Sequence, residues 1–490
     1  MLLINVLLFT GLAVSAVVKN ELGKRQGTAC ASLIAPEIPG ASVVSITGTQ
    51  VAAAPARCVV TLVLNHTNST DRVNIITWLP ARRWNGRFLG TGGSGFTAGG
   101  SPTALLTPVA EGYAAGTTDA GLPISFDGTA FANDTQLVTN FAHLSIHEMT
   151  VVGKALSEQF YGTPVKYAYW SGCSTGGRQG YMEAQRYPED YQGVYAASPA
   201  INWDRFHVAM LWPYIVQNVE GEFVPQCIFD TLTNAAIEAC DADDSGVDKL
   251  ISNPNACKFD ATSMVGKSAT CGEDSATNIT ERQAFIFNKI AHGPVDAAGN
   301  KLWSGIALGA SHSSLAGSQP FALGSGWTRA YVLRDLDYDL KQITYNTFTE
   351  IINKAHTEWD ELIGTDNPDL SGFQQAGGKL LSWHGWADPL IFANGTVDYR
   401  LRVEQQMGGS EEVDEFYRLF FAPGVGHCGG GGPVPTEPFK ALVNWVEKGE
   451  IPQTLAATGG GNTRNLCRFP YTLKYRGSGA IAEAASWSCL

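Results

Sequence analysis

A serine flanked by glycines is the first group in this sequence that could form a covalent intermediate. The stretch Gly172-Cys173-Ser174-Thr175-Gly176 matches G-x-S-x-G, the pattern of a nucleophile elbow, in which a sharp turn between a strand and a helix exposes the serine hydroxyl. Glycines tolerate the strained backbone angles and close chain contacts of such a turn. A plain glycine turn carries the same letters, so the flanking elements must decide.

A serine hydroxyl needs a histidine base, and that histidine needs an acid that fixes its tautomer. Asp388 follows an expected strand, and His427 lies in a glycine-rich loop after the last expected strand. The chain order Ser, Asp, His is that of α/β-hydrolases. Taken singly, Asp388 or His427 is also typical of an ordinary loop, and competing histidines include His147, His207 and His384. We predict that Asp388 and His427 complete a triad.

Each of two predicted triad members has a cysteine beside it: Cys173 precedes Ser174, and Cys428 follows His427. If the serine and the histidine are within hydrogen-bond distance, the two cysteines are neighbours and should form a disulfide in an oxidising compartment. Closing so long a loop stabilises the fold by about 5 kcal/mol in a simple chain-entropy treatment. The alternative is that each cysteine pairs elsewhere.

An oxyanion hole requires two backbone N–H groups, one of them from the residue after the nucleophile. That residue is Thr175, and the glycine-rich stretch 91–96 is the expected source of the second donor. The sequence leaves open whether Gly93 or Ser94 provides it. A flexible tight turn is the alternative for this stretch.

The stretch 240–251, CDADDSGVDKLI, gathers four carboxylates around one glycine and so offers the hard oxygen ligands that calcium takes. It begins like an EF-hand loop, but the twelfth position of that pattern holds Ser252 instead of glutamate. We therefore predict a calcium loop of another kind, with a solvated acidic turn as the alternative. Cys257 would pair with Cys240 around this loop.

The elements around these residues alternate between strands and helices. Strands are predicted at 73–79, 87–89, 113–116, 165–170, 380–383 and 418–421, and helices at 141–160, 178–186 and 439–448. This alternation predicts an α/β fold with a mostly parallel sheet. Residues 201–374, with four cysteines and poor strand periodicity, are predicted to be an insertion between two parts of the α/β domain, 26–200 and 375–490.

The overall composition is that of a globular protein, with 490 residues, 44% hydrophobic and 16% charged. The net charge of -13 and the lack of clustered Lys and Arg argue against nucleic acid or an anionic membrane as partner. Residues 1–16 are apolar and end in small residues, which predicts a signal peptide, and Lys24-Arg25 offers a second processing site. We expect a secreted, extracellular protein.

Two further features agree with secretion. The ten cysteines are even in number and lack a zinc-like C-x-x-C pair, which favours five disulfides. Glycosylation sequons occur at Asn65, Asn68, Asn133, Asn278 and Asn394. A glycan at Asn394 could crowd the predicted site, because it lies six residues after Asp388.

Taken together, these residues resemble the tannase/feruloyl esterase family. The matching stretches are GCSTGGRQG at 172–180, QRYPEDYQG at 185–193, HGWADPLI at 384–391, PGVGHC at 423–428 and LVNWVEKGEIP at 442–452. The resemblance implies an α/β-hydrolase with the triad Ser174, Asp388 and His427, and a disulfide between Cys173 and Cys428. It also implies that the insertion is a lid that covers the active site, supplies substrate-binding residues and carries calcium.

Mapped onto this chain, the family's calcium loop gives as ligands the side chains of Asp241, Asp244 and Asp248 and the main-chain oxygens of Gly246 and Leu250. The loop departs from the family pattern, because Ser245 and Lys249 stand where the family usually has glycine. The resemblance and the spacing of the cysteines also indicate three other disulfides, Cys30 to Cys58, Cys227 to Cys271 and Cys467 to Cys489.

The resemblance implies a serine esterase that cleaves hydroxycinnamate esters, such as feruloyl esters of plant polysaccharide. The alternatives are a tannase acting on galloyl esters, an esterase for other aryl esters, and a non-catalytic binding protein on a hydrolase fold. The insertion is short for a full tannase. The acyl group, the alcohol and the oligomeric state are not determined by the sequence.

Overall fold

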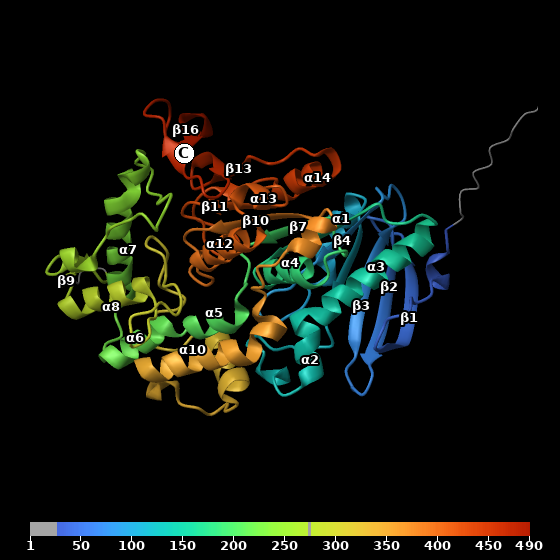
Figure 1. Ribbon diagram of the computed structural model, residues 1–490, viewed down its shortest axis with the longest axis horizontal. Helices are drawn as coiled ribbons and strands as arrows, with labels where there is room; N and C mark the ends of the chain where they lie inside the picture. Colours follow the sequence, from blue (N-terminus) through green and yellow to red (C-terminus); the bar gives the residue numbers. More distant parts are fainter. Residues whose placement is uncertain (1–26, 273–275) are drawn as a thin grey trace, which may run out of the picture.

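A nine-stranded sheet forms the centre of the computed structural model, which describes residues 27–272 and 276–490 (Figure 1). The strand order is β1-β2-β3-β5-β4-β6-β7-β10-β11. The strands are β1 Ala41–Val51, β2 Arg57–His66, β3 Val73–Pro80, β4 Arg87–Thr91, β5 Ala114–Thr118, β6 Tyr167–Cys173, β7 Gly193–Ala197, β10 Lys379–Gly385 and β11 Tyr417–Ala422. The predicted signal peptide and the Lys24-Arg25 site lie outside the described residues.

The pairing divides the sheet into two parts. β5, β4, β6, β7, β10 and β11 pair in parallel, whereas β1, β2 and β3 form an antiparallel extension that joins at β5. The prediction of an α/β fold with a mostly parallel sheet is therefore confirmed. β1 and β2 were not among the predicted strands.

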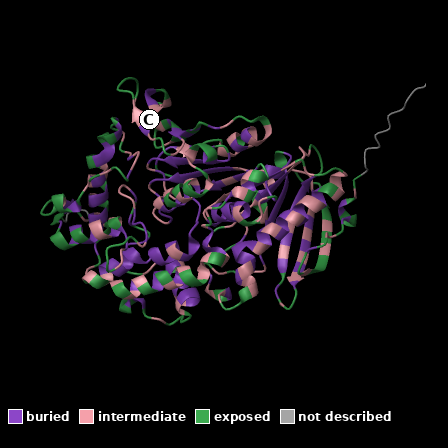
Figure 2. Ribbon diagram, in the orientation of Figure 1, coloured by how far each residue is buried: buried purple, intermediate pink, exposed green. Residues whose placement is uncertain are grey.

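Helices cover both faces of the sheet. Neighbouring residues of a strand point to opposite faces, so the packing of two consecutive residues shows which helices lie on each face. On β10, Leu380 packs in the same cluster as residues of α3, α4 and α12, while Leu381 packs with residues of α1 and α14. Buried residues concentrate in the sheet and on the helix faces that meet it (Figure 2). The helices of this domain are α1 Leu106–Ala110, α2 Thr135–Thr139, α3 Ser145–Tyr161, α4 Thr175–Arg186, α12 Asn394–Met407, α13 Ser410–Asp414 and α14 Pro438–Lys448.

The predicted insertion, residues 201–374, is mainly helical and lies beside the sheet, coloured from green through yellow to orange (Figure 1). Its helices are α5 Trp203–Ala209, α6 Trp212–Glu220, α7 Gln226–Cys240, α8 Glu281–His292, α9 Ala322–Gly326, α10 Tyr345–Trp359 and α11 Ser371–Gln375, with the short hairpin β8 Ser268–Thr270 and β9 Ala276–Asn278. Its apolar cluster also contains Phe96, Phe131 and Phe141 of the preceding segment. The insertion thus shares its core with the α/β domain.

Small strands follow the central sheet at the C-terminal end. β12 Val434–Pro435, β13 Thr454–Gly459 and β14 Asn462–Cys467 form one sheet, and β15 Leu473–Tyr475 pairs with β16 Trp487–Cys489. β14 brings Arg464 to the acidic loop of the insertion. Among the described residues, no helix combines the length and the apolar character needed to cross a bilayer.

Candidate active site

The G-x-S-x-G stretch forms a sharp turn between β6 and α4. Ser174 stands between Cys173, the last residue of β6, and Thr175, the first of α4. Its backbone angles are φ 62° and ψ -123°, a combination that costs an L-residue on the order of 1–3 kcal/mol and is found mainly at functional sites. The strand and helix that a nucleophile elbow requires are thus both present.

The glycines of this turn are needed because other backbone occupies the space of a side chain. A Cβ at Gly172 would lie 2.3 Å from the carbonyl carbon of Gly176, and one at Gly177 would lie 2.6 Å from the carbonyl oxygen of Ala197. No real Cβ contact is that short, so any other residue would push the turn apart. The sequence requirement therefore follows from packing.

Ser174, His427 and Asp388 form a hydrogen-bonded chain. The Ser174 Oγ lies 2.9 Å from His427 Nε2, and His427 Nδ1 lies 2.8 Å from Asp388 Oδ2. The side chain of Asp388 is fully buried and that of His427 is 20% exposed. The three residues meet because β6, β10 and β11 run parallel and each residue follows the carboxyl end of one of them.

Asp388 has partners on both carboxylate oxygens. Its Oδ1 accepts the backbone N–H groups of Leu390 and Ile391, and its Oδ2 is bonded to His427 and His384. Burial alone would raise the pKa of this carboxyl, but the hydrogen bonds of the two histidines outweigh burial and lower the pKa below its usual range. Asp388 is therefore held ionised.

His384 has a place in this site that the sequence did not predict. Its Nε2 lies 3.2 Å from Asp388 Oδ2 and 2.9 Å from the carbonyl oxygen of Ile391, and its Nδ1 lies 2.8 Å from Thr396 Oγ1. In the sequence it was only a competitor for the role of base. Its position four residues before Asp388 was the available signal.

The other two competing histidines lie elsewhere. His147 is bonded to Asp190 at 2.6 Å. His207 is buried beside the rings of Phe96, Trp203 and Phe206, and burial lowers its pKa to about 3. Neither is among the hydrogen-bond partners of Ser174.

A disulfide joins Cys173 to Cys428 across 255 residues, the pairing expected from their neighbours. The four other disulfides are Cys30–Cys58, Cys227–Cys271, Cys240–Cys257 and Cys467–Cys489, again the expected pairs. The bridge at Cys428 is supported by a hydrogen bond from its backbone N–H to Ser198 Oγ at 3.3 Å. The nucleophile and the base are thus covalently linked through their neighbours.

The glycine-rich loop 91–96 lies against the nucleophile turn. The N–H of Gly176 donates to the carbonyl of Gly93 at 3.1 Å, and Thr175 Oγ1 donates to the carbonyl of Gly95 at 2.6 Å. Both candidate amides have other acceptors: Gly93 N–H donates to Gln179 Oε1 at 2.9 Å, and Ser94 N–H donates to Thr97 Oγ1 at 3.2 Å. Ser94 therefore has the weaker competing bond.

The acidic loop of the insertion holds its three central aspartates by hydrogen bonds. Asp241 accepts the backbone N–H groups of residues 248 and 249, Asp244 accepts the N–H of Gly246 and the hydroxyl of Ser252, and Asp248 pairs with the guanidinium of Arg464. The backbone path at Gly246 is set by packing, because a Cβ there would lie 2.5 Å from the Trp487 ring. The disulfide Cys240–Cys257 closes the loop.

The charges of this loop are not balanced by protein groups. Burial raises the pKa of Asp244 despite its hydrogen bonds, and burial also raises the pKa of Asp248 despite the nearby Arg464. Three carboxylates face one guanidinium, which leaves two negative charges. Hard oxygen donors with this charge fit a calcium ion, which the family resemblance implies at this loop.

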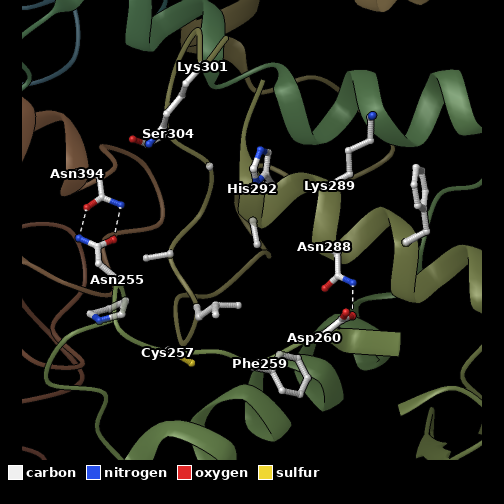
Figure 3. A pocket seen from close by; sticks show the side chains of 16 residues that line it. Asn255, Cys257, Phe259, Asp260, Asn288, Lys289, His292, Lys301, Ser304 and Asn394 are labelled. Atoms are coloured by element: carbon white, nitrogen blue, oxygen red, sulfur yellow. Dashed lines mark hydrogen bonds between the residues drawn. The ribbon is translucent and has the colours of Figure 1, made fainter. Parts of the chain in front are cut away.

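A cavity of about 700 Å³ opens between α8 of the insertion and the start of α12. In Figure 3, Asn394 faces Asn255, and two amide hydrogen bonds of 2.7 and 2.9 Å join them. Thr396 of the same sequon is buried and bonded to His384. A glycan on Asn394 would break its hydrogen bonds with Asn255. This change would occur two residues before Thr396, which contacts His384.

The family profile described as "Tannase and feruloyl esterase" matches residues 58–490. The chain belongs to this family. It is accordingly a carboxylic ester hydrolase with an α/β-hydrolase fold, as the sequence predicted. The matched range of this chain contains Ser174, Asp388 and His427 as well as the acidic loop.

Two relatives and two solved structures place the chain within the family. It is 41% identical to "Probable feruloyl esterase" of Arthroderma benhamiae, covering 99% of this chain and 98% of the relative, and 30% identical to feruloyl esterase B of Aspergillus niger, covering 92% and 90%. The structure resembles tannin acyl hydrolase from Aspergillus niger with a TM-score of 0.83 at 27% identity over 92% of each chain. It resembles feruloyl esterase B from Aspergillus oryzae with a TM-score of 0.81 at 27% identity, covering 93% and 98%.

Proposed function

We propose that this protein is a secreted serine esterase that hydrolyses hydroxycinnamate esters of the feruloyl type, free or linked to polysaccharide. The observation that carries the proposal is the hydrogen-bonded chain from Ser174 through His427 to the buried Asp388, set on a strained turn. The acyl class is supported by the 41% identity with a relative named as a feruloyl esterase. Similarity to a tannin acyl hydrolase structure supports galloyl esters as the second candidate.

The proposed reaction begins when Ser174 Oγ attacks the ester carbonyl and His427 Nε2 takes the hydroxyl proton. The carbonyl oxygen becomes an oxyanion, which the N–H of Thr175 stabilises together with an N–H of the 92–95 loop. We favour Ser94 for the second donor, because its bond to Thr97 is longer than the bond of Gly93 to Gln179.

The tetrahedral intermediate collapses when His427 gives the proton to the leaving alcohol, so that the acyl group remains esterified to Ser174. Water then attacks this ester, with His427 as base, and releases the acid and the free serine. Asp388 keeps Nδ1 of His427 protonated and stabilises the imidazolium in both steps. Because hydrogen bonds lower its pKa, Asp388 stays a carboxylate throughout.

The test is hydrolysis of methyl ferulate, methyl caffeate and methyl gallate by the wild type and by Ser174→Ala. We expect turnover of the two cinnamates that is lost in the variant. A preference for gallate would favour the tannase alternative. If the wild type cleaves none of the three, the protein is better explained as a binding protein on a hydrolase fold.

We also propose that the insertion is a lid stabilised by one calcium ion at Asp241, Asp244 and Asp248, with main-chain oxygens of Gly246 and Leu250. The unbalanced carboxylate charge supports this site. Calcium would neutralise that charge and fix the loop. We expect a chelator to lower the Tm of the wild type and to have little effect on Asp244→Asn; an equal drop in both proteins would contradict the proposal.

Secretion is supported by the apolar residues 1–16 and by the five disulfides. We expect the protein expressed from its full sequence in a eukaryotic host to be recovered from the medium. N-terminal sequencing would show cleavage after Ala16 or after Arg25. Recovery of protein that still begins at Met1 would contradict this.

A further inference from the structure

A second group of charged side chains lies in the insertion, outside the Ser174 site. It consists of Asp204 on α5, His356 on α10, and Asp360, which follows α10 directly. The Asp204 side chain is fully buried, while those of His356 and Asp360 are 43% and 37% exposed. α5 and α10 are early and late helices of the insertion and lie side by side (Figure 1).

One ligand atom from each of the three side chains is close enough to the others to reach a shared metal ion. His356 Nδ1 lies 2.7 Å from Asp204 Oδ2 and 3.7 Å from Asp360 Oδ1, and one ligand atom of each residue lies within 4.8 Å of the others. Tetrahedral zinc with bonds of 2.0–2.1 Å places its ligand atoms about 3.4 Å apart. Over the described ranges, no other trio of His, Cys, Asp or Glu side chains has this spacing. The aspartates of the predicted calcium loop do not have it either, because that loop would also use main-chain oxygens.

Two oxygens of the group lack a hydrogen-bond partner. These are Oδ1 of Asp204 and Oδ1 of Asp360, both inaccessible to solvent. Both face the space beside Gly364, because a Cβ built there would lie 2.3 Å from the Asp360 oxygen and 3.3 Å from the Asp204 oxygen. A buried carboxylate oxygen without a partner is costly, so a cation bound by these two carboxylates would stabilise the fold.

The Nη2 groups of two nearby arginines donate to another carboxylate. Arg205 Nη2 donates to Asp366 Oδ2 at 2.6 Å, and Arg402 Nη2 donates to the same oxygen at 3.2 Å. The remaining contact, from Arg205 Nε to Asp204 Oδ2, is 3.7 Å long. A cavity of about 740 Å³, lined in part by His356 and Asp360, gives an ion and water access to the group.

We propose that Asp204, His356 and Asp360 bind one zinc ion that ties α5 to α10. An imidazole with two carboxylates is a ligand set that zinc accepts, and water from the cavity would complete the coordination. The site is separate from the predicted calcium loop and independent of the proposed esterase activity. The ligands must be deprotonated, so zinc affinity should rise with pH.

The test is calorimetric titration of the full-length protein with zinc chloride, after chelator treatment and with calcium in excess to occupy the acidic loop. We expect one zinc per chain, at least tenfold weaker binding in His356→Gln and in Asp360→Asn, and a zinc-dependent rise in Tm of the wild type that these two variants lack. His292→Gln and Asp337→Asn are matched controls that should bind zinc like the wild type, because both residues are exposed and lie outside the trio and its cavity. No zinc binding by the wild type, or equal binding in all variants, would overturn the proposal.

Discussion

The protein contains two aspartate–histidine pairs that look alike and end differently. In the Ser174 site, Asp388 is fully buried and lies 2.8 Å from a half-buried His427; in the insertion, Asp204 is fully buried and lies 2.7 Å from His356. Asp388 has partners on both oxygens, whereas Oδ1 of Asp204 has none. The first pair continues to a serine, and the second to another carboxylate.

This difference shows that an aspartate–histidine pair does not by itself define a function. In the first pair, every oxygen of the Asp388 carboxylate has a hydrogen-bond partner, and one of these partners is Nδ1 of His427. The other ring nitrogen, Nε2, therefore faces the Ser174 hydroxyl. In the second, His356 Nδ1 lies 2.7 Å from Asp204 and 3.7 Å from Asp360, so two carboxylates share one imidazole. The third residue therefore decides between proton transfer and metal binding.

The strongest way to break this comparison is to remove each histidine in turn. His427→Ala should lower kcat for methyl ferulate by about 10⁴-fold to 10⁶-fold, because Ser174 loses its base. His356→Ala should change kcat by less than threefold, because it touches no triad member. Activity of His427→Ala above 1% of wild type, in a variant with unchanged circular dichroism, would refute the assigned base.

The disulfide beside the first pair offers a second contrast. Replacing Cys173 and Cys428 by serine should lower the free energy of unfolding by about 5 kcal/mol in the chain-entropy treatment and also reduce kcat at least tenfold, since the bridge fixes the base relative to the nucleophile. Replacing Cys467 and Cys489 should cost about 3 kcal/mol and leave kcat within twofold. Denaturant unfolding and initial rates measure both. Equal kcat values in the two variants would show that the bridge is only structural.

His66 is a third histidine bonded to carboxylates, and its effect on stability should depend on pH. It is buried between Asp71 at 2.6 Å and Glu148 at 2.9 Å. Burial lowers its pKa, but the hydrogen bonds to Glu148 and Asp71 outweigh burial and raise the pKa to about 9. The protonated form therefore stabilises the fold fully below pH 6.5, and this contribution is lost as the pH rises toward 9.

The corresponding variant is His66→Gln. The wild type should exceed it in free energy of unfolding by up to about 3 kcal/mol more at pH 6 than at pH 9. Groups that do not contact His66 titrate alike in both proteins and cancel, so the difference reports His66 together with its partners Asp71 and Glu148. A difference that does not change with pH would show that His66 is neutral in the folded protein.

The sequence predicted the parts of the structure that local patterns encode. The elbow glycines must fit one turn, and Cys173 and Cys428 adjoin residues that have to meet, so their disulfide followed from the triad. β1 was missed because it is an outer strand with mostly exposed residues, including Val44, Thr47 and Thr49, and lacks an apolar alternation. β1 is held in an extended conformation by its antiparallel pairing with β2, which its own sequence pattern does not indicate.

Long-range side-chain contacts were beyond such patterns. Asp204 and His356 are 152 residues apart, and neither has a neighbour with a recognisable motif. The side chain of Gln179 accepts a hydrogen bond from the N–H of Gly93, which is 86 residues away in the sequence. The sequence therefore could not decide whether Gly93 or Ser94 is the oxyanion donor. These contacts depend on how helices pack, which local spacing does not determine.

The smallest expected effect concerns His384. It is a hydrogen-bond partner of Asp388, and Asp204 has no corresponding partner on its Oδ1. Its ring donates to Asp388 or to Ile391 and does not contact Ser174, so we regard it as a positioning residue. His384→Leu removes the donor and should lower kcat/KM about tenfold, because a less well held Asp388 orients His427 less well.

His384→Gln keeps an N–H donor near the ring Nε2 and should recover activity to within threefold of the wild type. The split between kcat and KM adds a second readout: the loss in His384→Leu should fall on kcat, because Asp388 orients the base, while KM should stay close to that of the wild type. Both variants remove the same ring volume from the same buried position. If both variants lose kcat equally, His384 acts through packing, and Asp388 is held in place by its two backbone N–H bonds alone.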